Sequence, residues 1–348
     1  MPAKRHSTLF TPAVTDPIAS IADWVELLCL SSGNNVSRGD LVGWLAIAGE
    51  KGDFSQDEDL DEGAENLIGD VFAEIERRGS AAAESYPFGL NEDGSILSVN
   101  EPFSNEGKVA YLYGLFATAC TNGELLSKEF FDDTARKAIP EYLQICAAIS
   151  AAGLLTGGSC SFGWPRPKVK RFSDALRKVV NDHVQEGEVR KNPRPGSAKT
   201  VKDAGIDIIA WRGFPDGMPG KLILFGQCAS GGAWKDKGTR TYVKPLFSDF
   251  FDDSFPSEVI DAIFIPRCIC VSKDRIQGAS TSETISGLFR HYTTRLGIVV
   301  DRCRLAHLLP KGLEAHARQE HVDRVNDFGK VAKAVKKWSS AMSKTKAA

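Results

Sequence analysis

The chain of 348 residues lacks the motifs that would assign a function at once. Its eight cysteines form no CxxC pair, and its six histidines include no pair spaced four residues apart. It has no Walker phosphate loop, no GxGxxG after a strand-like run and no GxSxG elbow. These absences argue against a zinc ribbon, a disulfide framework, and ATP or dinucleotide chemistry. We therefore expect the cysteines to be reduced, buried side chains.

Long hydrophobic runs are also missing. The longest uncharged stretch, from Leu143 to Trp164, is interrupted by Ser, Thr and Gly. Its apolar part, Ile145 to Leu155, is too short to span a bilayer, which takes about 20 residues. The N-terminal residues have no apolar segment typical of a signal peptide. These features predict a cytoplasmic protein with no membrane contact.

Charge is distributed unevenly along the chain, although the net charge is only -2. Residues 1–100 hold 6 Lys and Arg against 18 Asp and Glu, so the remainder has a basic excess. An acidic front half and a basic rear half favour contact between the rear half and a polyanion such as nucleic acid. Two alternatives stay open: the charges only solvate separate surfaces, or the acidic half mimics nucleic acid and restrains the basic half.

Hydrophobic periodicity divides the chain into three parts. Apolar residues recur at helical spacing through residues 1–155, which predicts an acidic all-α domain that could bind a protein partner. Residues 156–310 have a helix at Phe172 to Gly187, followed by β-type runs with helices between them, typical of a mixed α/β sheet domain. Residues 311–348 are predicted to form a basic helical tail whose last residues, from Trp338 onward, are frayed.

Two of the β-type runs flank a loop rich in Gly and Pro, "RGFPDGMPG". A turn centred near Gly217 would pair them antiparallel and place Asp207 opposite Gln227. A carboxylate and an amide oxygen on one face of a sheet are suitable ligands for Mg²⁺, which binds one or two protein groups plus water and phosphate. The alternative is that both residues are ordinary polar strand ends with no catalytic role.

The segments "AGIDIIAW" and "KLILFGQCA" resemble the Gly-x-Asp, strand, loop, strand, Gln-x-Lys arrangement of PD-(D/E)XK nucleases. The likeness is greatest to the Mrr-like, QxK branch of these restriction-endonuclease-like proteins, of a kind found in bacterial phage defence. It covers residues 160–275 and implies a mixed β-sheet flanked by helices. It further implies Mg²⁺ or Mn²⁺ bound by Asp207 and Gln227.

The resemblance departs from the family at the lysine position, which is Ala229. Because that lysine orients the attacking water and offsets phosphate charge, its loss removes a transition-state contact. The resemblance therefore implies that Lys235 or, preferably, Lys237 takes its place from the following segment. An upstream acid, Glu186, would complete the metal ligands, with Glu188 and Asp203 as other choices.

Basic residues are dense just before the hairpin. Residues 165–202 hold 11 Lys and Arg against 4 acids. Such density favours binding to a phosphate backbone, with a solvated helix face as the alternative. The predicted nucleic-acid-binding residues are Arg166, Lys168, Lys170, Arg171, Arg177 and Lys178. His183, near the end of the same helix, is either a phosphate contact or a surface residue.

Arg302 and Arg304 follow a later strand, and either contact nucleic acid or close the domain through an ion pair with Asp301.

These observations predict a metal-dependent nuclease that hydrolyses DNA in defence against foreign DNA. The alternative function is an inactive nuclease-like subunit that binds nucleic acid within a larger defence complex.

Overall fold

The structure, a computed structural model, describes residues 8–13, 16–31, 35–48, 59–122, 125–127, 129–163, 169, 171–195, 204–237, 248–269 and 281–347. Its main feature is a five-stranded mixed sheet in the order β11-β10-β8-β7-β5. β7 pairs antiparallel with both β5 and β8, whereas β10 pairs parallel with both β8 and β11. The strands are β5 (Gly158–Ser161), β7 (Ile208–Arg212), β8 (Leu222–Cys228), β10 (Val259–Phe264) and β11 (Ile298–Val300).

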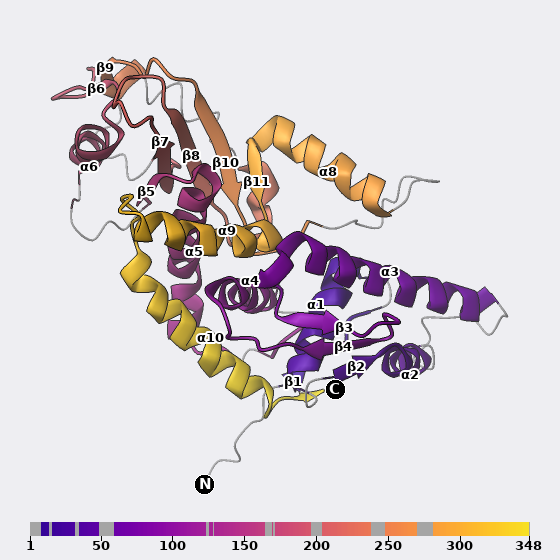
Figure 1. The fold of residues 1–348 in the computed structure, drawn as a ribbon. Coiled ribbons are helices and arrows are strands. Elements are labelled where there is room, and N and C mark those ends of the chain that lie inside the picture. The colour runs from indigo at the N-terminus through magenta and orange to yellow at the C-terminus, as the bar shows by residue number, and fades with distance from the viewer. Residues whose placement is uncertain are drawn as a thin grey trace, which may run out of the picture.

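Helices cover both faces of this sheet, as Figure 1 shows. On one face lie α5 (Asp133–Leu155) and α9 (Arg302–Ala317). On the other lie α6 (Phe172–Val179), which continues as one π-helical turn to Val184, and α8 (Thr281–Leu296). The predicted mixed sheet flanked by helices is thus confirmed, and so is the predicted helix after residue 172.

The β7–β8 hairpin has the register that its turn predicts. Ile208 lies opposite Gly226, and Arg212 opposite Leu222. A turn from Phe214 to Gly217 is closed by the Gly217 N–H, which donates to the Phe214 carbonyl at 3.1 Å, and the Gly217 φ of +70° suits glycine. The turn chemistry and the alternation of apolar residues agree, which is why this register could be read from the sequence.

The N-terminal half is not all helical. Besides α5, its described α-helices are α1 (Ile18–Ser31), α2 (Arg38–Ala48), α3 (Asp59–Ala82) and α4 (Glu106–Asn122). Between them is an antiparallel sheet in the order β2-β4-β3, formed by β2 (Asn35–Ser37), β4 (Ile96–Val99) and β3 (Phe88–Leu90). The prediction of an all-α domain missed these strands because three or four residues are too few to show a period of two.

One hydrophobic core extends across the predicted boundary at residue 155. Side chains of α1, α4, α5 and α9 join the inner face of the large sheet in a single cluster. Of the described helices, α5 alone is long and apolar enough to cross a membrane, and 67% of its most apolar window is buried inside the protein. That burial is typical of a core helix.

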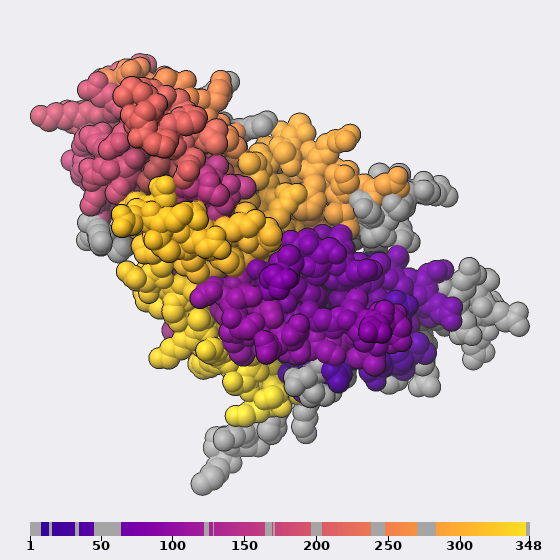
Figure 2. All heavy atoms as spheres, in the orientation of Figure 1, coloured from indigo at the N-terminus to yellow at the C-terminus, as the bar shows by residue number. Residues whose placement is uncertain are grey.

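The C-terminal residues are also packed rather than frayed. Trp338 and Met342 of α10 (Phe328–Met342) are buried, and the Trp338 ring contacts Phe116 and Phe131. The short strand β12 (Lys346–Ala347) then pairs with β1 (Thr8–Leu9). Figure 2 shows this yellow segment lying along the N-terminal half. The prediction of a frayed end was wrong because the sequence does not show what Trp338 packs against.

Two buried arginines connect the N-terminal helices to α9. The Arg302 guanidinium binds both carboxylate oxygens of Asp23, at 2.7 and 3.0 Å. Arg78 of α3 donates to Asp23, at 2.8 Å, and to Glu26, at 3.0 Å. Because Arg302 is fully buried, the predicted contact with nucleic acid is wrong, and its ion-pair partner is Asp23 rather than Asp301. Asp301 instead caps α9 through the Arg304 N–H.

We expect this buried network to make the stability of the fold depend on pH in acid. Burial alone would raise the pKa of Asp23, but Arg302 and Arg78 outweigh burial and hold that pKa below its ordinary value of 3.8. A depressed pKa contributes stability above the unfolded-state value, and this contribution is lost as the pH falls through the folded-state value. We expect the urea midpoint to decrease below about pH 4. An Asp23→Asn protein should lose less stability over the same range, and equal losses in both would contradict the prediction.

Candidate functional site

The residue predicted to bind metal, Asp207, lies immediately before β7. Its backbone N–H donates to the Gly226 carbonyl at 2.8 Å, and its own carbonyl accepts from the N–H groups of Phe162 and Gly163. These bonds connect it to β8 on one side and to the end of β5 on the other. The main chain at Asp207 is therefore held from both neighbouring strands.

The Asp207 carboxylate is directed toward the α5 face of the sheet. Oδ2 accepts from the Cys228 backbone N–H at 2.7 Å, and Oδ1 accepts from Nε2 of Gln144, in α5, at 3.3 Å. A Cβ atom at Gly163 would lie 2.4 Å from Oδ1, so only glycine allows this approach. Sequence reasoning missed Gln144 because it assigned α5 to a separate domain.

Gln227 does not share this face. Residues 225, 227 and 229 share one face of the strand, and Phe225 and Ala229 belong to the clusters under α6 and α8. Cys228 packs on the opposite, α5 side. The Oε1 atom of Gln227 is buried, and no residue in the described part of the chain donates a hydrogen bond to it. The predicted register is correct, but the Asp207 side chain turns toward Cys228 and Gln144. The structure therefore does not bring the Asp207 carboxylate and the Gln227 amide together.

The two candidate lysines have different surroundings. The Lys235 ammonium lies 6.0 Å from the Trp234 ring centroid and 5.7 Å from that of Tyr292, on the α8 side. Lys237 follows the short helix Gly232–Asp236, and its positive charge acts on the Cys228 thiol. Burial, and then the Asp207 carboxylate, raise the pKa of the Cys228 thiol well above its ordinary value, and the Lys237 charge opposes this rise. Of the two lysines, Lys237 is therefore the one whose charge acts on Cys228, the residue whose N–H binds Asp207.

Two other predicted positions have structural roles. Ala229, at the family's lysine position, is buried in the apolar cluster with Trp234 and Ile263. Glu186 lies at the opposite end of the hairpin, where it accepts from the N–H groups of Gly220 and Lys221. It also accepts from the Ser257 hydroxyl. The predicted metal ligand Glu186 is therefore a full strand length away from Asp207. Sequence order alone could not show this separation.

The remaining upstream acids are placed as follows. Glu188 lies in β6 (Glu188–Val189), opposite Asp253 of β9 (Phe251–Asp253). Asp203 lies outside the described residues.

Only some of the predicted basic surface can be located. Arg166, Lys168 and Lys170 lie outside the described residues. Arg171 is well exposed at the start of α6. Arg177 instead pairs with Asp174 and donates to the backbone carbonyls of residues 190 and 191.

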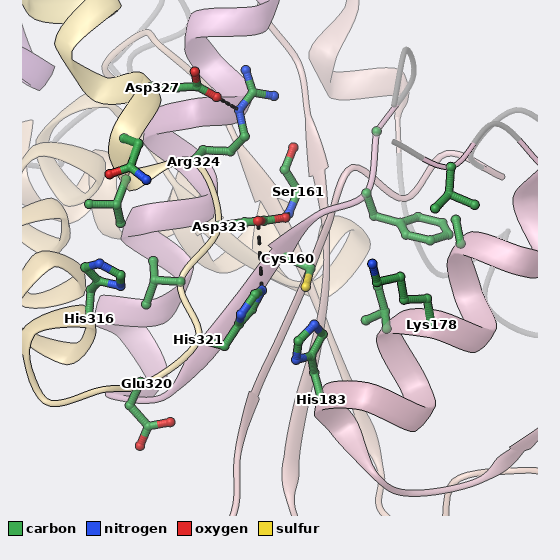
Figure 3. Close-up of a pocket in the computed structure, with 18 of the residues that line it drawn as sticks. Cys160, Ser161, Lys178, His183, His316, Glu320, His321, Asp323, Arg324 and Asp327 are labelled. Carbon is green, nitrogen blue, oxygen red and sulfur yellow. Dashed lines mark hydrogen bonds and ion pairs between the residues drawn. The ribbon is translucent and has the colours of Figure 1, made fainter. Parts of the chain in front are cut away.

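Lys178 lines a cavity of about 780 Å³ between β5, α6 and the loop after α9. Figure 3 shows three further side chains of this cavity facing one another: Cys160, His183 and His321. One donor atom from each lies within 4.8 Å of the others. The two imidazole rings are stacked with centroids 3.8 Å apart. These residues come from distant parts of the chain, so no spacing in the sequence could reveal the cluster.

The backbone holds the His321 loop against the edge of the sheet. The Ser159 N–H donates to the His321 carbonyl at 2.8 Å, and the Asp323 N–H donates to the Ser159 carbonyl at 3.0 Å. The loop is further held by Arg324, which binds Glu141 and Asp327. These main-chain bonds keep His321 beside Cys160, although the two residues are 161 positions apart in the sequence.

The comparisons with known proteins do not identify the chain. No protein-family model matches it, and neither the curated proteins nor the solved structures contain a match.

Proposed function

We propose that this protein is a metal-dependent nuclease that hydrolyses DNA phosphodiester bonds in defence against foreign DNA, with Asp207 at its catalytic centre. The observation that carries the proposal is the Asp207 carboxylate at the end of β8, where it accepts from the Cys228 N–H at 2.7 Å and where the Lys237 charge also acts on the Cys228 thiol. An acid and a cation at one strand end are the two charges that phosphodiester hydrolysis with a metal requires.

The residues around Asp207 are compatible with a hard cation. Mg²⁺ and Mn²⁺ prefer oxygen ligands, and Mg²⁺ often uses a single carboxylate with water and phosphate. Asp207 would hold the ion, with the Gln144 amide beside it. Gln227 would not take part, because its side chain faces the other side of the sheet. When bound, such an ion supplies an activated water and polarises the phosphate.

The test is cleavage of plasmid, linear duplex, single-stranded DNA and RNA with Mg²⁺ or Mn²⁺, beside an EDTA control. We expect Asp207→Asn to lower the cleavage rate at least about 100-fold. Asp216→Asn, which changes an exposed aspartate of the same hairpin, should leave the rate unchanged. Wild-type protein that cleaves none of the substrates, or Asp207→Asn that cleaves equally well, would refute the proposal.

The two lysines provide a matched pair for the cation. Lys237→Ala should slow cleavage by about 100-fold, because a charge that stabilises the transition state is lost. Lys235→Ala removes the same charge two residues before Lys237. Because the Lys235 ammonium lies beside the Trp234 and Tyr292 rings, this substitution should change the rate less than about twofold. If the two substitutions have equal effects, Lys237 is not the catalytic cation.

The alternative, a nuclease-like subunit that binds nucleic acid without cleaving it, is favoured by a different observation. The Asp207 carboxylate already accepts two hydrogen bonds from the protein, and the family's lysine position is the buried Ala229. This function predicts DNA binding that weakens with salt, because counterion release provides the affinity. It also predicts equal DNA affinity for the wild type and Asp207→Asn, which a filter-binding titration would measure.

A further inference from the structure

The cavity beside α6 contains a donor set that the proposed nuclease does not use. Cys160 lies in β5, His183 in the π-helical turn after α6, and His321 in the loop between α9 and α10. Their three donor atoms lie within 4.8 Å of one another. Cys160 pairs with Ile209 and faces the α6 cluster, whereas the Asp207 carboxylate faces α5. The two sites are therefore on opposite faces of the sheet.

We propose that Cys160, His183 and His321 bind a single zinc-type divalent ion, with a fourth position open to the cavity. One thiolate and two imidazoles are the ligands that Zn²⁺ prefers, whereas Mg²⁺ requires oxygen ligands. Three protein ligands with an open position are typical of zinc sites that bind an additional water or anion. Lys178 lines the same cavity and would favour an anion at that position.

Ion binding would change the protonation of the cysteine in this ligand set. Burial, and then the neighbouring His321, lower the pKa of His183, so its imidazole is neutral and can donate a lone pair at neutral pH. Burial, and then Asp323, raise the pKa of the Cys160 thiol well above its ordinary value, so the thiol is protonated without an ion. Binding then forms the sulfur–metal bond and releases the thiol proton to water.

The surroundings support the histidines as ligands. The Asp323 carboxylate lies 3.9 Å from Nε2 of His321 and accepts from the Ser161 N–H at 3.3 Å. Carboxylates beside ligating histidines set their tautomer and orientation. An imidazole lone pair lies in its ring plane, and the two ring planes are only 20° from parallel, so binding requires at least one ring to rotate out of the stack. His183 also stacks on Trp211, with centroids 5.7 Å apart, which limits that rotation.

The experiment uses the full-length protein, stripped of metal by a chelator and titrated with Co²⁺ and then with Zn²⁺. We expect one equivalent of Co²⁺ to give a thiolate-to-metal charge-transfer band and tetrahedral visible bands, which Zn²⁺ abolishes. One proton should be released per ion, and Zn²⁺ should raise the thermal midpoint. Wild-type protein with no thiolate band and no shift in the midpoint would overturn the proposal.

Substitutions identify the ligands. Cys160→Ser should abolish the charge-transfer band and weaken Co²⁺ binding at least about tenfold. His321→Asn, on a partly exposed loop, should weaken binding similarly and keeps the test valid if Cys160→Ser does not fold. His316→Asn, in the same cavity, and Cys120→Ser, a half-buried cysteine elsewhere, should bind like the wild type. Equal losses in these controls, or full binding by Cys160→Ser, would show that the cluster is only a packed aromatic stack.

The site is separable from the proposed nuclease centre. Asp207→Asn should retain Co²⁺ binding with the thiolate band, because its carboxylate lies on the other face of the sheet. Loss of the band in Asp207→Asn would overturn the assignment to Cys160.

Discussion

Replacement of Arg302 by methionine should lower the free energy of unfolding by about 3–5 kcal/mol. The guanidinium is fully buried, binds both oxygens of Asp23 and donates to the carbonyl of Pro266 at 2.9 Å. Methionine has a similar volume, so the loss comes mainly from the carboxylate that stays buried. Arg78 still binds that carboxylate, at 2.8 Å, which places the expected loss toward the lower end of the range. Urea denaturation with a tryptophan fluorescence readout would measure it.

The matched control for this prediction is an exposed ion pair. Lys337 lies 3.5 Å from Asp132, and both side chains are more than half exposed. Lys337→Ala should leave the free energy of unfolding nearly unchanged, because solvent screens the pair. A loss for Arg302→Met no larger than that of the control would show that the buried network does not stabilise the fold.

Substitution of Gly312 by alanine should destabilise the protein by about 3 kcal/mol. A Cβ atom at Gly312, in α9, would lie 1.9 Å from the Ile149 carbonyl oxygen of α5. Conversely, a Cβ at Gly153 of α5 would lie 2.1 Å from the Leu308 carbonyl oxygen of α9. The two helix backbones are thus in direct contact, and one methyl group must push them apart. Because α5 and α9 cover the same face of the sheet, the separation would disturb the main core.

Gly287→Ala provides the opposite expectation. This glycine lies inside α8, and an added Cβ would meet nothing within 4 Å. Alanine there should stabilise the protein by about 0.5–1 kcal/mol, because it lowers the backbone entropy of the unfolded chain. Urea midpoints for both variants would decide the matter. If Gly312→Ala were as stable as Gly287→Ala, the close approach of α5 and α9 would be disproved.

Several elements could be predicted from local information alone. The β7–β8 register follows from the turn at Asp216-Gly217 and from the alternation of apolar residues on both sides of it. The helix after residue 172 follows from its apolar spacing. The strands β2 and β4 could not be predicted in this way, because each is short and depends on its neighbours for hydrogen bonds.

The residues of the candidate site likewise divide into those that the sequence could indicate and those that it could not. The sequence indicated Asp207, since an acid before a buried strand must find partners. It could not indicate Gln144, because the Gln144–Asp207 contact joins α5 to the start of β7, and the sequence predicted these two elements to lie in separate domains. It placed Glu186 beside Asp207, whereas the structure uses Glu186 to bind the N–H groups at the other end of the hairpin.

The sequence by itself determined the features that depend on local spacing. These are the helices, the β7–β8 hairpin with its register, and the acidic residue Asp207 at the edge of that hairpin. The tertiary structure decided which face each polar side chain took and which distant residues met. It directed Asp207 toward Gln144, joined Arg302 to Asp23, and brought Cys160 to His183 and His321. Such contacts depend on how helices and strands pack in three dimensions, and the spacing of residues along the chain does not predict that packing.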